Sequence, residues 1–356
     1  MPLIIDGSRV PSRWAERLSR SMTPVDSHVR YVGGPSIALI NNMPDSALED
    51  TEVQFFELLD IASGDLPVYV KLYSLTGVPR TDRGERHLNS FYYPFDDLWK
   101  NQFDGVIITG TEPRFADLRQ EPYWNLLAQV FDWAQRNTSS TVLSCLAAHA
   151  SVLYCDGIKR HPLPDKKFGV FEATTSGDHF LMSNARDTVR FPHSRWNEVR
   201  ENELIAGGYT VLSKSVDAGV DVFAKKAKKS LFVHFQGHPE YGAQTLFKEY
   251  RRDIKRFLRK ERETYPIFPH GYFDAAAAET LNTYRERAVA DRREEMIDSF
   301  PESVTKTLQH TWQGSAIGVY KNWLGYIVER KAERGSFPVL ARVAPSRPAI
   351  VEGEIA

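Results

Sequence analysis

The segment TVLSCLAAHA, residues 141–150, indicates the fold more clearly than any other part of the chain. An apolar run leads into Ser144 and Cys145, and small residues that suit a helix follow them. This is the strand–turn–helix context of a nucleophile elbow, in which a sharp turn holds a reactive side chain at the edge of a sheet. The following helix N-terminus favours a thiolate, and backbone N–H groups of the turn can form an oxyanion hole. The sequence therefore predicts that Cys145 is a nucleophile and that Cys155 is structural.

Strand and helix patterns alternate on the N-terminal side of this segment. Buried strands are predicted at 37–40, 68–72 and 105–109, and helical spacing of apolar residues occurs at 48–61 and 123–137. Such alternation is typical of βαβ units and predicts an α/β fold with a doubly wound, mostly parallel sheet flanked by helices. Ligands of such folds bind beyond the carboxyl ends of the strands, which is where the loops NNMP, TGTEP and SCLAAHA would lie.

Three parts are expected along the chain. Residues 1–34 contain several prolines and are expected to be irregular, residues 35–262 form the α/β domain, and residues 263–356 form a helical C-terminal extension with a frayed end. Aromatic side chains of the extension would bury either on the α/β domain or against a second subunit in a homodimer. The sequence leaves both alternatives open for Trp312, Tyr320, Trp323 and Tyr326.

Composition argues against several classes of protein. Hydrophobic residues make up 42% of the chain, enough for a core, and the formal net charge of -1 gives no overall field that would attract nucleic acid. Two cysteines do not suggest a disulfide scaffold and fit a reducing compartment. No stretch approaches the ~20 apolar residues of a membrane helix, and the N-terminus has no apolar signal core. We therefore expect a cytoplasmic protein with no nucleic-acid partner, no membrane partner and no metal.

The sequence His238-Pro239-Glu240 follows another buried strand pattern and would lie on the same sheet edge as Cys145. His238 can accept the thiol proton, and Glu240 can accept the second imidazole N–H and so fix the tautomer. A lone histidine is usually structural. A histidine with a carboxylate two residues on, in a chain that also has a cysteine elbow, favours a catalytic triad.

Six sequence blocks give the chain a resemblance to a known family. They are NNMP (41–44), DGVIITGTEP (104–113) with YW at 123–124, TVLSCLAAHA (141–150), KKFGVFE (166–172), PHSRW (192–196) and GHPEYGAQTLFKEYRRD (237–253). The blocks resemble the homoserine O-succinyltransferases and O-acetyltransferases of methionine biosynthesis. The resemblance implies that residues 35–262 form an acyltransferase domain with a class I glutamine-amidotransferase-like, flavodoxin-like fold. It also implies succinyl-CoA or acetyl-CoA as co-substrate, L-homoserine as acceptor, and no bound cofactor.

The resemblance also assigns roles to individual residues. Cys145 takes the position of the acyl thioester, His238 that of the proton acceptor, and Glu240 the third position of the triad. Three further residues fall where the family contacts substrate: Lys166, Ser194 and Arg252. An arginine can hold a carboxylate as a fork, a serine can hydrogen-bond a polar group, and a lysine can offset negative charge.

Two positions depart from the family pattern. Lysines commonly follow NMP in the family, whereas Asp45, Ser46 and Ala47 follow it here, so a positive group near the acyl-CoA or the oxyanion is missing or is supplied from elsewhere. Arg114 occupies the position that the resemblance links to acyl choice. Its cation suits a carboxylate-bearing acyl group, which favours succinyl over acetyl; a side chain that fills the pocket or points away is the alternative.

The same motifs leave other activities open. These are acyl transfer to another amino acid, such as serine, and a thiol hydrolase or glutaminase of the same fold. The elbow lacks the flanking glycines that are typical of glutaminases. A non-catalytic binding protein is least favoured, because such a protein has no reason to keep Cys145, His238 and Glu240 together.

Overall fold

The computed structural model describes residues 3–5, 33–176, 178–183, 185 and 187–334. These residues build one ten-stranded sheet. Its strands are β1 (Leu3–Ile5), β2 (Ser36–Ile40), β3 (Val68–Tyr73), β4 (Gly105–Ile108), β5 (Ser140–Ser144), β6 (His161–Thr175), β7 (Thr188–Glu198), β8 (Thr210–Ser215), β9 (Gly219–Ala227) and β10 (Ser230–Phe235). They lie in the order β1-β3-β2-β4-β5-β10-β9-β8-β6-β7.

The direction of the strands confirms the α/β prediction. From β1 to β10 every neighbouring pair in this order is parallel, whereas β9, β8, β6 and β7 continue the sheet in antiparallel pairing. The fold is therefore a doubly wound, mostly parallel sheet with an antiparallel extension. Parallel strands are buried on both faces, which explains the continuous apolar runs that mark β2 and β4 in the sequence.

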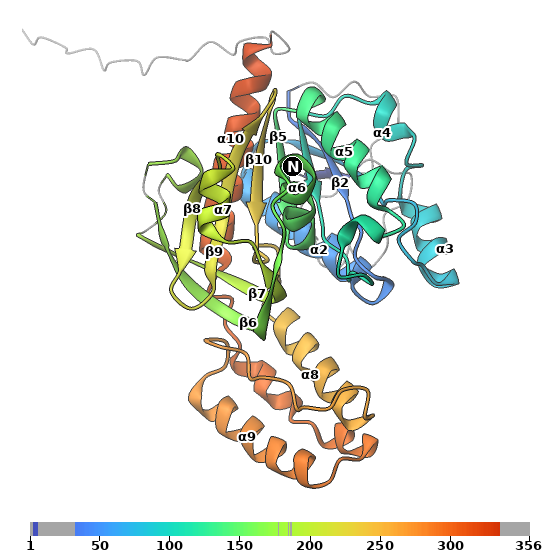
Figure 1. Cartoon of the computed structure of the whole chain (residues 1–356), viewed down its shortest axis with the longest axis vertical. Helices are drawn as coiled ribbons and strands as arrows, with labels where there is room; N and C mark the ends of the chain where they lie inside the picture. Colours follow the sequence, from blue (N-terminus) through green and yellow to red (C-terminus); the bar gives the residue numbers. More distant parts are fainter. Residues whose placement is uncertain (1–2, 6–32, 177, 184, 186, 335–356) are drawn as a thin grey trace, which may run out of the picture.

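Helices cover both faces of the sheet (Figure 1). Alternate residues of β2 point to opposite sides, so Ile37 and Leu39 join one core cluster while Ala38 and Ile40 join another. The first cluster is closed by α2 (Asp45–Ser63) and α10 (Gln313–Glu333), and the second by α5 (Trp124–Asn137) and α6 (Leu146–Asp156). The other α-helices in the described part of the chain are α3 (Asp82–Phe91), α4 (Asp97–Lys100), α7 (Glu201–Ala206), α8 (Thr245–Leu258) and α9 (Ala275–Ala290).

The register of the parallel strands aligns the predicted functional loops. Ile40 pairs with Ile108, Ile108 with Leu143, and Ser144 with Phe235. The loops that leave β2, β4, β5 and β10 therefore begin side by side at one edge of the sheet. This edge carries NNMP, TGTEP, the Cys145 turn and the His238 loop, as the sequence predicted.

The N-terminal segment differs in part from the irregular structure that its prolines predict. Leu3–Ile5 forms β1, which pairs in parallel with Val68–Val70 of β3 at the edge of the sheet. The apolar side chains of Leu3 and Ile5 reach the core beside α2, which is why this short strand forms despite the prolines around it. The rest of the N-terminal prediction, residues 6–32, lies outside the described residues.

The C-terminal segment packs on the rest of the chain. Trp312, Tyr320 and Trp323 are 0%, 1% and 1% exposed, and α10 packs against α2 on the face of the sheet. Of the two alternatives left open, burial on the same chain therefore holds for these three residues. In Figure 1, α8 and α9 lie beyond the ends of β6 and β7, where they share a separate cluster that includes Trp312. The boundary at residue 262 stays a prediction. None of the helices in the described residues is long and apolar enough to span a membrane.

Candidate active site

Cys145 lies at a strained turn between β5 and α6. Its φ of 53° and ψ of −111° place a non-glycine residue in a sparsely populated region, a conformation that costs roughly 1–3 kcal/mol and clusters at functional sites. The backbone is held on both sides: the Cys145 amide donates to the Phe235 carbonyl at 2.8 Å, and the Cys145 carbonyl accepts from Ala148 N at 3.0 Å. The turn therefore presents a partly exposed thiol at the sheet edge.

The loop after β10 brings His238 and Glu240 to this thiol. The His238 imidazole interacts electrostatically with the Cys145 side chain, and its Nδ1 lies 2.9 Å from Glu240 Oε1. The same carboxylate oxygen accepts from Ser144 Oγ at 3.1 Å. Close backbone packing fixes the loop, because a Cβ on Gly237 would lie 2.8 Å from the carbonyl oxygen of Pro192. The three residues predicted as a triad are thus brought together, with histidine between thiol and carboxylate.

The electrostatics of this trio favour a charged imidazole. Burial alone would lower the pKa of His238, but the neighbouring Cys145 and Glu240 outweigh burial and hold the pKa well above its ordinary value. An imidazolium held between a carboxylate and a sulfur is the arrangement that supports a thiolate nucleophile.

Two arginines near Cys145 were missed by the sequence reasoning. Arg195, in the PHSRW block, is 3% exposed and donates to the carbonyls of Asn197, at 2.8 Å, and Ala218. Burial lowers the pKa of Arg195, and the charge of Cys145 works in the opposite direction. Arg160 hydrogen-bonds carbonyls of the loop after β4. Burial lowers its pKa as well, and Tyr123, Glu121 and then Cys145 oppose that effect. Both guanidinium groups therefore add positive potential around the sulfur.

Lys166 and Ser194 meet at a buried acidic group on α8. Ser194 Oγ donates to one carboxylate oxygen of Glu249, and Tyr241 donates its hydroxyl to the other at 2.6 Å. Lys166 Nζ lies 3.6 Å from Glu249 and 3.2 Å from Asp253, and its side chain is 7% exposed. Lys166 is therefore bound to two acids. Glu249 was missed, although it comes one helical turn before Arg252, a spacing that puts both on one face of α8.

Arg252 borders the same acidic group. Its side chain is 47% exposed, and Nε and NH2 both donate to Asp253 Oδ1, at 3.1 and 3.0 Å. Burial lowers the pKa of Arg252, whereas Asp253, Glu249 and Glu112 raise it, with a net rise. Glu112 belongs to the TGTEP loop, so the charge interaction links the loop after β4 with α8. All three predicted substrate residues, Lys166, Ser194 and Arg252, thus gather around Glu249 and Asp253.

Arg114 has an exposed side chain on the loop after β4. Its backbone is anchored, because the amides of Arg114 and Phe115 donate to Glu121 Oε1 at 2.6 and 2.9 Å. Glu121 is 4% exposed and so fixes the course of this loop from within. The role of Arg114 in acyl choice stays a prediction.

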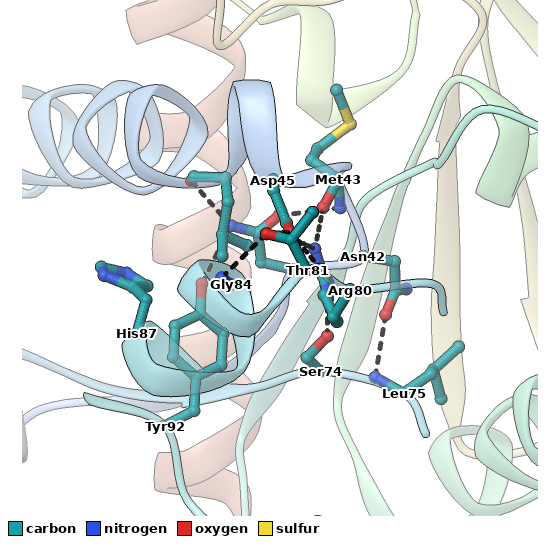
Figure 2. Close-up of polar contacts among 12 residues, drawn as sticks. Asn42, Met43, Asp45, Ser74, Leu75, Arg80, Thr81, Gly84, His87 and Tyr92 are labelled. Atoms are coloured by element: carbon teal, nitrogen blue, oxygen red, sulfur yellow. Dashed lines mark hydrogen bonds and ion pairs between the residues drawn. The ribbon is translucent and has the colours of Figure 1, made fainter. Parts of the chain in front are cut away.

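An arginine from a different part of the chain contacts the NNMP loop (Figure 2). Arg80, on the segment after β3, donates to the Met43 carbonyl at 2.5 Å, to Asp45 at 3.1 Å and to Ser74 Oγ at 2.9 Å. Asp45 also accepts from the amide and hydroxyl of Thr81, both at 2.6 Å. The departure of the sequence at Asp45 is therefore matched by a buried arginine that comes from outside the motif.

The chain is similar to curated proteins over most of its length. A family model described as homoserine O-succinyltransferase matches residues 21–334. A homoserine O-succinyltransferase of Rhodopseudomonas palustris is 44% identical and covers 81% of this chain and 86% of that protein. Those of Methylorubrum extorquens and Bradyrhizobium japonicum are 42% and 41% identical, with 83% and 92% of this chain covered and 88% and 100% of those proteins.

Among solved structures, a glutamine amidotransferase of Thermotoga maritima is similar with a TM-score of 0.42 and 13% identity, over 84% of this chain and all of that one. The sequence relatives, at more than 40% identity across most of both chains, decide the assignment. The chain belongs to the homoserine O-succinyltransferase family of acyltransferases.

Proposed function

We propose that this protein transfers an acyl group, succinyl in preference to acetyl, from acyl-CoA to the hydroxyl of L-homoserine through a thioester on Cys145. The observation that carries the proposal is the strained elbow at Cys145 with the hydrogen-bonded pair of His238 and Glu240 beside it. The names of the relatives support the choice of donor and acceptor. The proposal includes acyl-CoA as co-substrate, no bound cofactor, and a cytoplasmic enzyme; a homodimer remains an expectation.

In the first half-reaction the enzyme becomes acylated. His238 takes the proton of the Cys145 thiol, and the sulfur attacks the carbonyl carbon of the acyl-CoA thioester. The intermediate collapses with cleavage of the carbon–sulfur bond to CoA, and His238 returns the proton to the departing CoA thiolate. Glu240 stabilises the imidazolium and fixes the nitrogen that faces the sulfur.

The developing oxyanion is expected at the N-terminus of α6. The first N–H groups of a helix have no acceptor within the helix, and here they belong to Leu146 and Ala147, directly after the nucleophile. Gly110 passes beside them: a Cβ at this position would lie 3.0 Å from Leu146 N. A glycine therefore keeps the space in front of this amide open.

In the second half-reaction the acceptor hydroxyl replaces CoA. His238 accepts the hydroxyl proton, the oxygen attacks the thioester carbon, and the Cys145 sulfur leaves with the proton returned through His238. Around Glu249, the site offers a carboxylate for the substrate ammonium and the Arg252 guanidinium for its carboxylate. Lys166, held by Asp253 and Glu249, offsets the charge of the two acids.

Steady-state kinetics with varied donors and acceptors test the proposal. Product formation at several concentrations of succinyl-CoA and homoserine should give the parallel double-reciprocal lines of a ping-pong reaction. Acetyl-CoA should give a lower kcat/KM than succinyl-CoA. Serine in place of homoserine should react poorly, and glutamine should release no ammonia. Intersecting lines, or ammonia release faster than acyl transfer, would contradict the proposal.

A further inference from the structure

Tyr241 stands between the proposed base, His238, and the proposed acceptor pocket, the group formed by Lys166, Ser194, Glu249 and Arg252. Its ring is stacked on the His238 imidazole, with centroids 4.2 Å apart and planes 19° from parallel. Its hydroxyl donates to Glu249 Oε1 at 2.6 Å. The side chain is 5% exposed, so neither contact competes with bulk water.

Glu249 carries this contact to the proposed acceptor pocket. Its second oxygen accepts from Ser194 Oγ and lies 3.6 Å from Lys166 Nζ. A carboxylate held by two hydroxyl groups and an ammonium has a fixed orientation, because each donor lies in a different direction. Tyr241 therefore touches both the imidazole that moves the proton and the carboxylate proposed to hold the substrate ammonium.

The C-terminal segment fastens Tyr241 from behind. The indole N–H of Trp312, immediately before α10, donates to the Tyr241 carbonyl at 2.7 Å, and Trp312 is 0% exposed. The Tyr241 amide in turn donates to the His238 carbonyl at 3.2 Å. The backbone at Tyr241 is thus held from both the triad loop and the C-terminal segment.

We propose that Tyr241 is a positioning residue that aligns the acceptor pocket with the imidazole, and that its hydroxyl acts through Glu249. The inference rests on the proposed function. It predicts that the two half-reactions respond differently when the hydroxyl is removed. Acylation by succinyl-CoA needs the stacked ring beside His238, whereas transfer to homoserine needs the bond to Glu249 as well.

The variant Tyr241→Phe keeps the ring and removes only the hydroxyl. The reaction with succinyl-CoA is quenched at successive times and the mass of the intact protein is measured. Cys145 of this variant should be acylated at a rate within about twofold of the wild-type rate. Transfer to homoserine should lose roughly 10- to 100-fold in kcat/KM, mainly through KM, the range expected for a hydrogen bond to a charged group. Tyr241→Leu, which also removes the stacked ring, should slow acylation as well.

The control is Tyr284→Phe, which removes another buried hydroxyl, one bonded to the Met296 carbonyl at 2.9 Å in the cluster that also contains Tyr241. Tyr284→Phe should lower the free energy of unfolding by about as much as Tyr241→Phe does, and it should leave the rates of both half-reactions unchanged. Glu249→Gln supplies the second test. Because the hydroxyl acts through Glu249, adding Tyr241→Phe to Glu249→Gln should lower kcat/KM for transfer to homoserine by less than about twofold.

An unchanged KM for homoserine in folded Tyr241→Phe overturns the inference. So does a double variant in which Tyr241→Phe lowers transfer to homoserine by the same factor as it does in the wild-type background. If Tyr241→Phe fails to fold, the double-variant comparison is replaced by Trp312→Phe, which must raise the homoserine KM through the loosened Tyr241 backbone. A wild-type enzyme that forms no acyl-enzyme instead defeats the proposed function, so the two failures are distinguishable.

Discussion

At the scale of single residues, Glu240 provides a pH-dependent test. Its carboxylate and Cys145 hold the pKa of His238 above its ordinary value despite burial, so the imidazolium–thiolate pair exists below that raised pKa and is lost as the pH rises through it. Glu240→Gln removes one of the two anions and lowers this pKa. We expect acylation to slow roughly 100-fold or more, with its alkaline limb shifted to lower pH. Rates of CoA release measured from about pH 6 to about pH 10 check this. The interval begins near the ordinary imidazole pKa and extends above it, where the raised pKa of His238 is expected.

The matched control is Glu172→Gln, which changes an exposed carboxylate paired with Arg190 at 2.8 Å. It should leave both the rate and the alkaline limb in place. If the alkaline limb of the acylation rate falls at the same pH in Glu240→Gln as in the wild type, Glu240 does not stabilise the imidazolium.

Arg252 tests the acceptor pocket separately from the nucleophile. Lysine cannot reproduce a planar guanidinium that bonds Asp253 through two nitrogens while its side chain stays 47% exposed. Arg252→Lys should therefore raise the KM for homoserine about 10-fold or more and leave Cys145 acylation unchanged. The neighbouring Arg251→Lys, whose arginine pairs with Glu302 at 2.6 Å, serves as the control. Equal homoserine KM values in the two variants would remove Arg252 from the pocket.

The sequence predicted some site residues well and missed others for identifiable reasons. Cys145, His238 and Glu240 stand in contiguous motifs at strand ends, so local pattern and sheet topology together predict their meeting. Glu249 could have been found from its helical spacing to Arg252. Arg195 could not, because its place depends on antiparallel pairing within the sheet extension, and no local pattern encodes that pairing.

At the scale of structural elements, the NNMP loop depends on one buried side chain. Arg80 is 6% exposed in its side chain and bonds Met43, Asp45 and Ser74 from another segment (Figure 2). Arg80→Met leaves these acceptors without their partner, so we expect a loss of about 3 kcal/mol in the free energy of unfolding. Urea denaturation followed by circular dichroism measures it.

Arg83→Met is the companion variant, because Arg83 also pairs with an acid, Glu49, yet is 77% exposed in its side chain. Its loss should stay below about 0.5 kcal/mol. Equal losses of unfolding free energy in Arg80→Met and Arg83→Met would show that Arg80 does not hold the loop in place. Arg80 itself was beyond sequence reasoning, because the motif does not show which distant residue contacts its loop.

At the scale of the whole molecule, α10 joins the chain's last described residues to its central sheet. Trp323 is 1% exposed, donates its indole N–H to Ser140 Oγ at 2.9 Å, and packs over Gly105 of β4. Trp323→Ala should therefore lower the free energy of unfolding by about 3–5 kcal/mol, in one cooperative transition with the sheet. The exposed Trp196→Ala should change it by less than about 0.5 kcal/mol.

Two separate unfolding transitions, one for α10 and one for the sheet, would contradict the idea that they share a core. The sequence predicted the central strands β2, β3, β4, β5 and β10, their parallel direction and the existence of C-terminal helices. It did not predict where α10 packs, because an apolar face shows that a helix must be covered but not by which surface. The short strand β1 was missed for a related reason: three residues form a strand only because β3 offers an unpaired edge.

The central claim is that Cys145 carries the acyl group, and intact-mass analysis after incubation with succinyl-CoA tests it most directly. We predict one succinyl adduct, located by peptide mapping on Cys145, that disappears when L-homoserine is added and that never forms in Cys145→Ala, while Cys155→Ala behaves as the wild type. An adduct that persists in Cys145→Ala, or homoserine acylation by an enzyme that never becomes acylated, would contradict the account.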